Sequence, residues 1–442
     1  MWALLCAAGP ARAEPAPTTE APPVPPAAVP APVPPAAAPA PVPPPATPTG
    51  PTVQRFEADD ETPSAPTAPP PAPKTETAPK TDAAAMPLTM DEMPVTATSN
   101  RVTVNFFGDP AFVIDSQHET TPGFVLNPLD FLITGRSGAL IAMTEFAMEQ
   151  IEGVVGIDIE RLFVGWHAER YQVDAGRTHA ELGYWNNAFH HGRWLQLPVE
   201  RPRVVRFEDE GGILPIHWVG VTGHWLPLLS GDQQIELAAS VGNGHGAIVD
   251  NILTDGDTNG FKALLAKLEV KGVGARDLRF GVSASYDRIG PEPATAPMGG
   301  FARPALPDTG IRELIANAYV AYRGPNLTFI SEAYEILHSA SGAMSGTWNT
   351  FDAFALAGYR LGEVVPYVLG EFRRTPTSPS DPFFFPDPTL PSEILLDFKE
   401  LTTGLRWDLT TWSALKLEYR ATLIDETNLR VQRGMLDWSF GL

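Results

Sequence analysis

The residues best suited to chemistry gather in one stretch of this 442-residue chain, between residues 178 and 212. Basic side chains come first and acidic ones follow: His190, His191, Arg193, Arg201, Arg203, Arg206, Glu208, Asp209 and Glu210. If the stretch folds into the opening of a pore, guanidinium and carboxylate groups face each other across it and filter solutes by charge and size. The alternative is that they solvate an exposed loop or pair locally, where an ion pair contributes only about 0–1 kcal/mol. We predict a charged pore constriction.

Two other patterns resemble metal sites, and neither is complete. The adjacent pair His190-His191 cannot point the same way on a strand, and no His-x-x-x-His or carboxylate spacing accompanies it. Residues 255–260 resemble the first half of a calcium loop, but Ala266 occupies the position that needs a bidentate Glu. We therefore expect residues 255–260 to form a plain turn, and we expect the protein to bind no metal and no cofactor. The weak calcium candidates are Asp255, Asp257 and Asn259.

The sequence contains no recognisable catalytic motif. Ser345 follows Gly342-Ala343-Met344, which does not match the Gly-x-Ser-x-Gly of a nucleophile elbow. Residues 242–246 form neither a P-loop nor a dinucleotide fingerprint. The formal net charge of −21 argues against a nucleic-acid partner, because phosphates are repelled by an acidic chain. We expect a protein that is not an enzyme and does not bind nucleic acid.

The first hundred residues differ in composition from the rest. Residues 14–95 are dominated by Pro and Ala, so we expect residues 14–100 to be a disordered periplasmic segment in polyproline II and coil. Residues 1–13 are interpreted as a signal peptide, because Met1–Gly9 is apolar and a small-x-small cleavage pattern follows. No Lys or Arg precedes the apolar run and the run is short, and a truncated start would explain both. The single cysteine, Cys6, lies in this run, so the mature chain has no thiol chemistry.

Residues 101–442 alternate apolar and polar side chains in segment after segment. In residues 276–287, for example, Leu278, Phe280 and Val282 share one face, and Arg, Gly and Ser share the other. A single such strand would also suit a soluble β-sandwich. The polar face, however, is rich in Gly, Ser and charges over hundreds of residues, as the wet lumen of a membrane barrel requires. No stretch approaches 18 uncharged apolar residues, so no transmembrane helix is predicted.

The connections between these segments alternate in length. Short turns at one end and long loops at the other are the layout of an outer-membrane barrel, and an even strand number places both termini at the periplasmic rim. The predicted fold is therefore an all-β transmembrane antiparallel barrel of about 16 strands, with 14 or 18 as alternatives. The predicted strands lie near residues 103–114, 127–136, 139–149, 156–167, 170–177, 213–226, 233–243, 261–271, 276–287, 312–323, 327–338, 348–360, 364–373, 394–408, 411–424 and 429–442.

Aromatic residues near the predicted strand ends suit the two membrane interfaces. The candidates are Trp166, Trp225, Trp412, Trp438 and Phe440. The last strand places Leu436, Trp438, Phe440 and Leu442 on one face. This resembles the C-terminal strand that outer-membrane proteins present to the barrel assembly machinery, with Leu442 in place of the usual terminal aromatic. We expect the barrel assembly machinery and outer-membrane lipid to be partners of this protein.

The stretch with the charged residues also carries a family resemblance. Residues 183–192 (Gly-Tyr-Trp-Asn-Asn-Ala-Phe-His-His-Gly) and Arg201-Pro202 resemble a group of uncharacterised porin-like outer-membrane proteins. More distantly, the layout is similar to the phosphate-selective porin superfamily. The resemblance implies a porin-type barrel. It does not extend to phosphate, because those porins use ladders of Lys and Arg and this barrel is acidic with few Lys.

Together these patterns predict an outer-membrane channel of a Gram-negative bacterium, through which small hydrophilic solutes diffuse passively past a charged constriction loop. One alternative is a structural anchor, in which the barrel holds the membrane and residues 14–95 bind peptidoglycan or a periplasmic protein. A second is an outer-membrane enzyme with its site in the long loops, and a soluble sandwich is the last.

Overall fold

The computed structural model describes residues 100–116, 122–151, 154–189, 192–208, 212–227, 233–244, 260–290, 310–342, 345–375, 381, 383–384, 397–425 and 428–442. All of them belong to the compact unit Ala78–Leu442. The predicted signal peptide, residues 1–13, and nearly all of the predicted disordered segment, residues 14–100, lie outside the described residues. No helix in the described part is long and apolar enough to cross a membrane.

The described residues form β-strands with only three short helices. The strands are β1 (Arg101–Gly108), β2 (Pro110–Asp115), β3 (Gly123–Leu126), β4 (Leu129–Ser137), β5 (Leu140–Ile151), β6 (Val154–His167), β7 (Tyr171–His179), β8 (His217–Trp225), β9 (Gln234–Gly242), β10 (Ala263–Lys271), β11 (Leu278–Ile289), β12 (Ile311–Arg323), β13 (Leu327–Ala340), β14 (Gly346–Tyr359), β15 (Val364–Arg374), β16 (Phe398–Thr410), β17 (Ser413–Ile424) and β18 (Leu429–Gly441). The helices are α1 (Trp185–Ala188), η2 (Arg193–Leu195) and η3 (Arg203–Val205).

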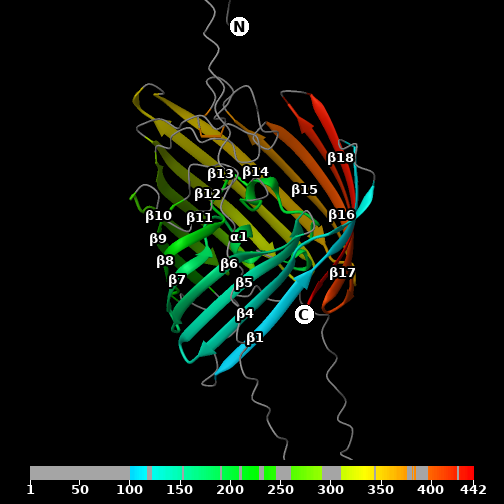
Figure 1. The fold of residues 1–442 in the computed structure, drawn as a ribbon. Helices are drawn as coiled ribbons and strands as arrows, with labels where there is room; N and C mark the ends of the chain where they lie inside the picture. The colour runs from blue at the N-terminus through cyan, green and yellow to red at the C-terminus, as the bar shows by residue number, and fades with distance from the viewer. Residues whose placement is uncertain are drawn as a thin grey trace, which may run out of the picture. The chain divides into compact units, whose positions relative to one another are not determined.

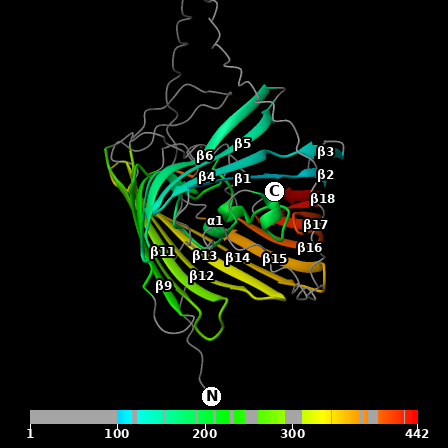
Figure 2. The same cartoon turned by 90° about the horizontal axis from the view of Figure 1, so that it is seen from below.

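Sixteen of these strands close an antiparallel barrel (Figures 1 and 2). From β4 to β18 each strand pairs with the next along the chain, and β1 closes the ring by pairing with both β4 and β18. Each of the sixteen predicted strands corresponds to an observed one. The fold class and the strand number predicted from the alternation are therefore confirmed, because period-2 patterning is a local property of each strand.

The first hairpin differs from the prediction, because both of its strands are interrupted at the same level. The predicted strand 103–114 breaks at Asp109, before Pro110, and the predicted strand 127–136 is preceded by the unpredicted β3, which ends before Asn127. The backbone nitrogen of a proline has no hydrogen and cannot donate a hydrogen bond to the ladder, so Pro110 marks the break in the first strand. The Asn127 side-chain amide bridges the two breaks by donating to the Asp109 backbone carbonyl (2.9 Å) and carboxylate (2.6 Å).

The outward and inward faces of the wall differ in the way the alternation predicts. Large apolar side chains such as Leu264, Val282 and Leu417 are exposed on the outward face. The interface candidates Trp166, Trp225, Trp412 and Trp438 are also exposed, whereas Phe440 is half-buried and packs edge-on against Phe106 at 6.2 Å. Such an apolar exterior suits a hydrocarbon environment.

The inward face is not the open, wet surface that its polar residues indicated. Charged side chains such as Glu332 and Arg420 are almost completely buried, and inward apolar residues such as Ile330, Ile336 and Phe354 lie beside them. The reason is that the connection between β7 and β8 crosses the inside of the barrel at this level (Figure 2).

Candidate functional site

The connection between β7 and β8 folds inside the barrel. The Ala180 amide donates to the Ile216 carbonyl (2.9 Å), directly after the last ladder pair of the two strands, so the chain leaves and rejoins the wall at one point. We call residues 181–215 the lumenal segment. It contains α1, η2 and η3, and Figure 2 shows α1 within the ring of strands.

An apolar core joins the lumenal segment to the wall. Trp185 has no exposed surface and packs against Phe189 of the segment (4.8 Å between ring centroids) and Phe354 of β14 (5.6 Å). Val199, Val204 and Val205 of the segment are also fully buried. Burial of a large apolar side chain contributes about 1.5–3 kcal/mol, so this core favours a docked segment over one that moves freely in the pore.

Carboxylates of the wall accept hydrogen bonds from the backbone of the lumenal segment. Glu332 of β13 accepts the amides of Tyr184 (3.0 Å) and Trp185 (2.6 Å). Glu418 of β17 accepts the amide of Val199 at 2.7 Å. In the same way, Glu371 of β15 accepts the Arg203 amide at 2.7 Å. These acids therefore satisfy amides that would otherwise be buried without a partner, which costs about 1–3 kcal/mol each.

Cations of the wall bind the carbonyl groups of the same segment. Arg406 of β16 donates to the carbonyls of Trp194 and Gln196. Lys416 of β17 donates to the carbonyls of Arg193 and Pro198. The segment begins at β7 and is held by β13 and β15–β17, so it crosses the lumen and is anchored on the opposite wall.

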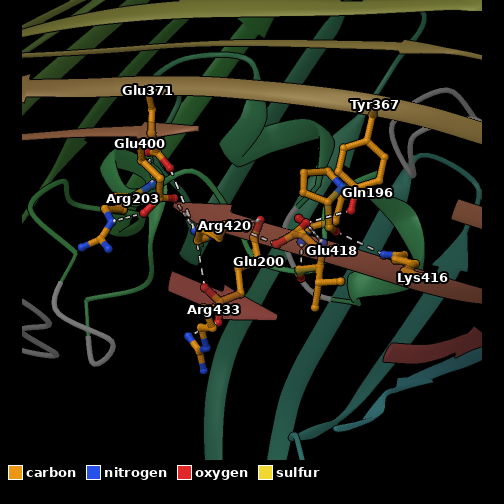
Figure 3. Close-up of polar contacts among 12 residues, drawn as sticks. Gln196, Glu200, Arg203, Tyr367, Glu371, Glu400, Lys416, Glu418, Arg420 and Arg433 are labelled. Carbon is orange, nitrogen blue, oxygen red and sulfur yellow. Dashed lines mark hydrogen bonds and ion pairs between the residues drawn. The ribbon is translucent and has the colours of Figure 1, made fainter. Parts of the chain in front are cut away.

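Arg420 of β17 lies at the centre of a buried cluster of carboxylates (Figure 3). Its guanidinium group contacts Glu400 at 2.8 Å, Glu418 at 3.3 Å and Glu200 of the lumenal segment at 3.4 Å. Arg203 of the segment adds a second cation and contacts Glu400 at 3.0 Å. Ion pairs of this kind tie the segment to β16 and β17.

Two of the predicted constriction residues are buried and hold the lumenal segment in place. Arg201 is buried, donates to the carbonyls of Val205 (2.6 Å) and Phe189 (3.1 Å), and lies 4.2 Å from the centre of the Phe207 ring. Glu208 is buried too. It accepts the amides of Ile216 (2.7 Å) and His217 (2.9 Å) and contacts the His217 ring at 3.0 Å.

The pKa of Glu208 reflects this position. Burial by itself would raise that pKa, but the charge of His217 and its side-chain and backbone hydrogen bonds outweigh the effect and lower it. Through these contacts the charged Glu208 fixes the end of the segment where the chain returns to β8.

The other predicted constriction residues that the structure describes keep some contact with water. The side chains of Arg193 and Arg206 are 25% and 20% exposed. Arg193 pairs with Asp109 at the break in the first hairpin (3.2 Å), and Arg206 pairs with Glu200 at 3.6 Å. Arg203 is also partly exposed. The predicted residues His190, His191, Asp209 and Glu210, and the calcium candidates Asp255, Asp257 and Asn259, lie outside the described residues.

Reasoning from sequence missed most of the partners of the lumenal segment. They lie on the inward faces of β13 and β15–β18 and include Glu332, Glu371, Glu400, Arg406, Lys416, Glu418, Arg420 and Arg433. The alternation did show these polar positions. Nothing in it could show that they bind a segment about 200 residues away in sequence.

One group in the described part of the barrel has the spacing of metal ligands: Glu181, His224 and Glu236. The ammonium group of Lys267 lies 2.8 Å from Glu181 and 3.9 Å from Glu236, so a cation already belongs to this group. His224 in turn contacts Glu236 at 3.0 Å. We assign no metal to it.

The stability of the lumenal segment is expected to depend on pH through Glu200. Burial alone would raise its pKa, but the guanidinium groups of Arg420, Arg206 and Arg433 lower the pKa from 4.5 to about 2. Because the folded pKa is the lower one, the stabilisation is complete above about pH 4.5 and is lost as the pH falls toward 2. The free energy of unfolding of the wild type should therefore decrease over this window more than that of Glu200→Gln. Denaturant titrations in detergent at several pH values measure this, and parallel curves would contradict it.

The fold of this chain, but not its sequence, is similar to that of known proteins. No family model and no curated protein matches the chain. Among solved structures, it is similar to an anion-selective porin from Comamonas acidovorans, with a TM-score of 0.54 and 9% identity over 78% of this chain and 100% of that one. It is also similar to OmpF of Salmonella typhi, solved with daunomycin, with a TM-score of 0.53 and 10% identity over 78% of this chain and 98% of that one. The chain therefore has the fold of the outer-membrane porins.

Proposed function

We propose that this protein is an outer-membrane channel for passive diffusion of small hydrophilic solutes, with the lumenal segment as its constriction. One observation carries the proposal: a segment that starts at β7 crosses the lumen and is bound by charged side chains of β13 and β15–β17. A segment in that position limits the free cross-section and sets the charge along it. The partly exposed guanidinium groups of Arg193, Arg203 and Arg206 are its filtering groups.

The arrangement of the rims supports a defined orientation in the membrane. Arg101 at the start of β1 pairs with Arg136, beside the short β4–β5 turn, and the end of β18 pairs with Ser413, beside the short β16–β17 turn. Both ends of the barrel thus lie on the rim of short turns, which faces the periplasm in outer-membrane barrels. We also propose that the C-terminal strand, with Leu436 and Trp438 exposed on its outward face, is the strand that the assembly machinery recognises.

Purified protein is expected to form ion-conducting channels in a planar lipid bilayer. In mild detergent it should migrate anomalously on an unheated gel and normally after boiling, because a closed barrel resists unfolding by detergent. The gel controls for folding in the bilayer experiment. Folded protein that gives no conductance would exclude the channel and favour the anchor, whose partner would bind residues 14–95. Compact, monodisperse protein without detergent would exclude the membrane barrel.

A further inference from the structure

The outward face of the wall carries cations at the rim where β11, β13, β15 and β17 end, which we call the far rim. The exposed cations in the last two positions of their strands at this rim are Arg288, Arg312, Arg374, Lys399 and Arg430. Near the opposite rim the outward side chains are aromatic instead, as at Tyr322, Trp407 and Trp438. A cation on a lipid-facing wall is tolerated at the membrane interface and is unfavourable in the hydrocarbon core. The cations therefore mark the level of the lipid head groups at the far rim.

A groove of about 480 Å³ lies on the outward face of β13, β14 and β15, which are neighbours in the wall (Figure 1). The side chains that line it are Glu335, Asn349, Phe351, Phe372, Arg374 and Thr375. The ladder places Phe351 between Glu335 on one neighbouring strand and Arg374 on the other. The ring centroids of Phe351 and Phe372 lie 5.7 Å apart, so two adjacent rings supply the apolar part of the lining. The groove thus combines an apolar surface with a cation at the far rim.

Arg374 is the cation of this groove. It is exposed, and within the part of the chain that the structure describes its side chain forms no ion pair and no hydrogen bond. Lys399 pairs with Phe372 in the ladder and adds a second cation beside the groove. Its ion pair with Asp425 (2.7 Å) joins side chains that are 66% and 38% exposed. Such an exposed pair is weak, so Lys399 can exchange Asp425 for another anion.

Two acids near the groove are engaged by other groups. The Asn349 side-chain amide donates a hydrogen bond to Glu335, on the far side of Phe351 from Arg374. Asp397 accepts hydrogen bonds from the Thr375 amide and from the Thr375 hydroxyl, the latter at 2.9 Å. Neither carboxylate forms an ion pair with Arg374 in the described structure. An anion can therefore approach Arg374 without displacing an acid of the protein.

We propose that this groove binds a phosphorylated glycolipid of the outer leaflet, with a phosphate on Arg374 and an acyl chain along Phe351 and Phe372. A guanidinium group binds phosphate oxygens through paired N–H donors and a permanent charge. Apolar rings suit an acyl chain. The lipid A anchor of lipopolysaccharide, which forms the outer leaflet of a Gram-negative outer membrane, has both parts. The inference goes beyond the channel function and uses only the orientation proposed above, in which the far rim faces outward.

Titration of the folded protein in mild detergent with diphosphorylated lipid A, followed by native mass spectrometry, tests the proposal. The wild type should bind lipid A more tightly than phosphatidylglycerol. Arg374→Gln should weaken lipid A binding by about fivefold, because one cation beside an anionic lipid is lost. Arg374→Lys keeps the charge and should retain most of the affinity. The matched control is Arg430→Gln, since Arg430 is an exposed cation at the same rim but lies on β18, outside the groove. It should keep the wild-type affinity.

Several outcomes would overturn the lipid site. Unchanged affinity in Arg374→Gln, or an equal loss in Arg430→Gln, would show that the groove does not hold the lipid. Tighter binding of phosphatidylglycerol would assign a different lipid, and equally tight binding of inorganic phosphate would assign a free anion. An oligomer that excludes lipid A would show that a second copy of the chain covers the groove. The unheated gel verifies that each variant is folded. None of these measurements needs conductance, so the lipid site and the channel function can fail separately.

Discussion

Replacement of the lumenal segment by an Asn-Gly turn is expected to raise the single-channel conductance by about threefold or more, because the segment crosses the lumen and narrows it. The barrel should still form. Ala180 and Ile216 are already hydrogen-bonded neighbours, and a two-residue Asn-Gly turn is a favoured connection between paired antiparallel strands. Planar-bilayer recordings measure the conductance, and migration on an unheated gel shows whether the barrel closes.

The same replacement is expected to shift the ion preference toward cations. Without the segment, Glu332, Glu371 and Glu418 lose the amides that they bind, and water reaches their carboxylates. Carboxylates that line an aqueous pore attract cations. The variant should therefore have a higher potassium-to-chloride permeability ratio than the wild type. If the variant forms barrels with wild-type conductance, the ion path does not pass the segment.

The second large effect is expected at Arg420. The Arg420→Met variant leaves the carboxylates of Glu200, Glu400 and Glu418 without their shared cation in a buried region. The loss of one partner from a buried ion pair costs about 3–5 kcal/mol, because the remaining charge stays desolvated. We therefore expect a decrease of this size in the free energy of unfolding, measured by denaturant titration of the folded form in detergent.

Two variants control for this result. Arg433→Gln removes a cation from the exposed edge of the same network and should cost only about 0–1 kcal/mol. Adding Glu400→Gln to Arg420→Met should restore part of the lost stability, since it leaves fewer buried carboxylates to share the remaining cation, Arg203. Equal losses in Arg420→Met and Arg433→Gln would show that Arg420 does not act as the buried centre of the cluster.

Much of the barrel follows from the sequence alone because strands are local structures. The alternation of Leu278, Phe280 and Val282 with polar neighbours places each strand and its outward face without knowledge of any partner. The break at Asp109 has a local cause, in Pro110 and Pro128, but its place in the wall became clear only from the pairing of β1 with β4 and of β2 with β18.

For the site, the sequence determined the segment and its charges but not their roles. Arg201, Arg203 and Arg206 are alike in type and close in sequence, and yet Arg201 is buried within the segment, Arg203 pairs with Glu400 of the wall and Arg206 pairs with Glu200 of the segment. The partner of Arg203 lies in the wall, 197 positions further along the chain. Burial and pairing are set by which surfaces meet in three dimensions, so only the tertiary structure decided which of these arginines is buried and which keep some contact with water.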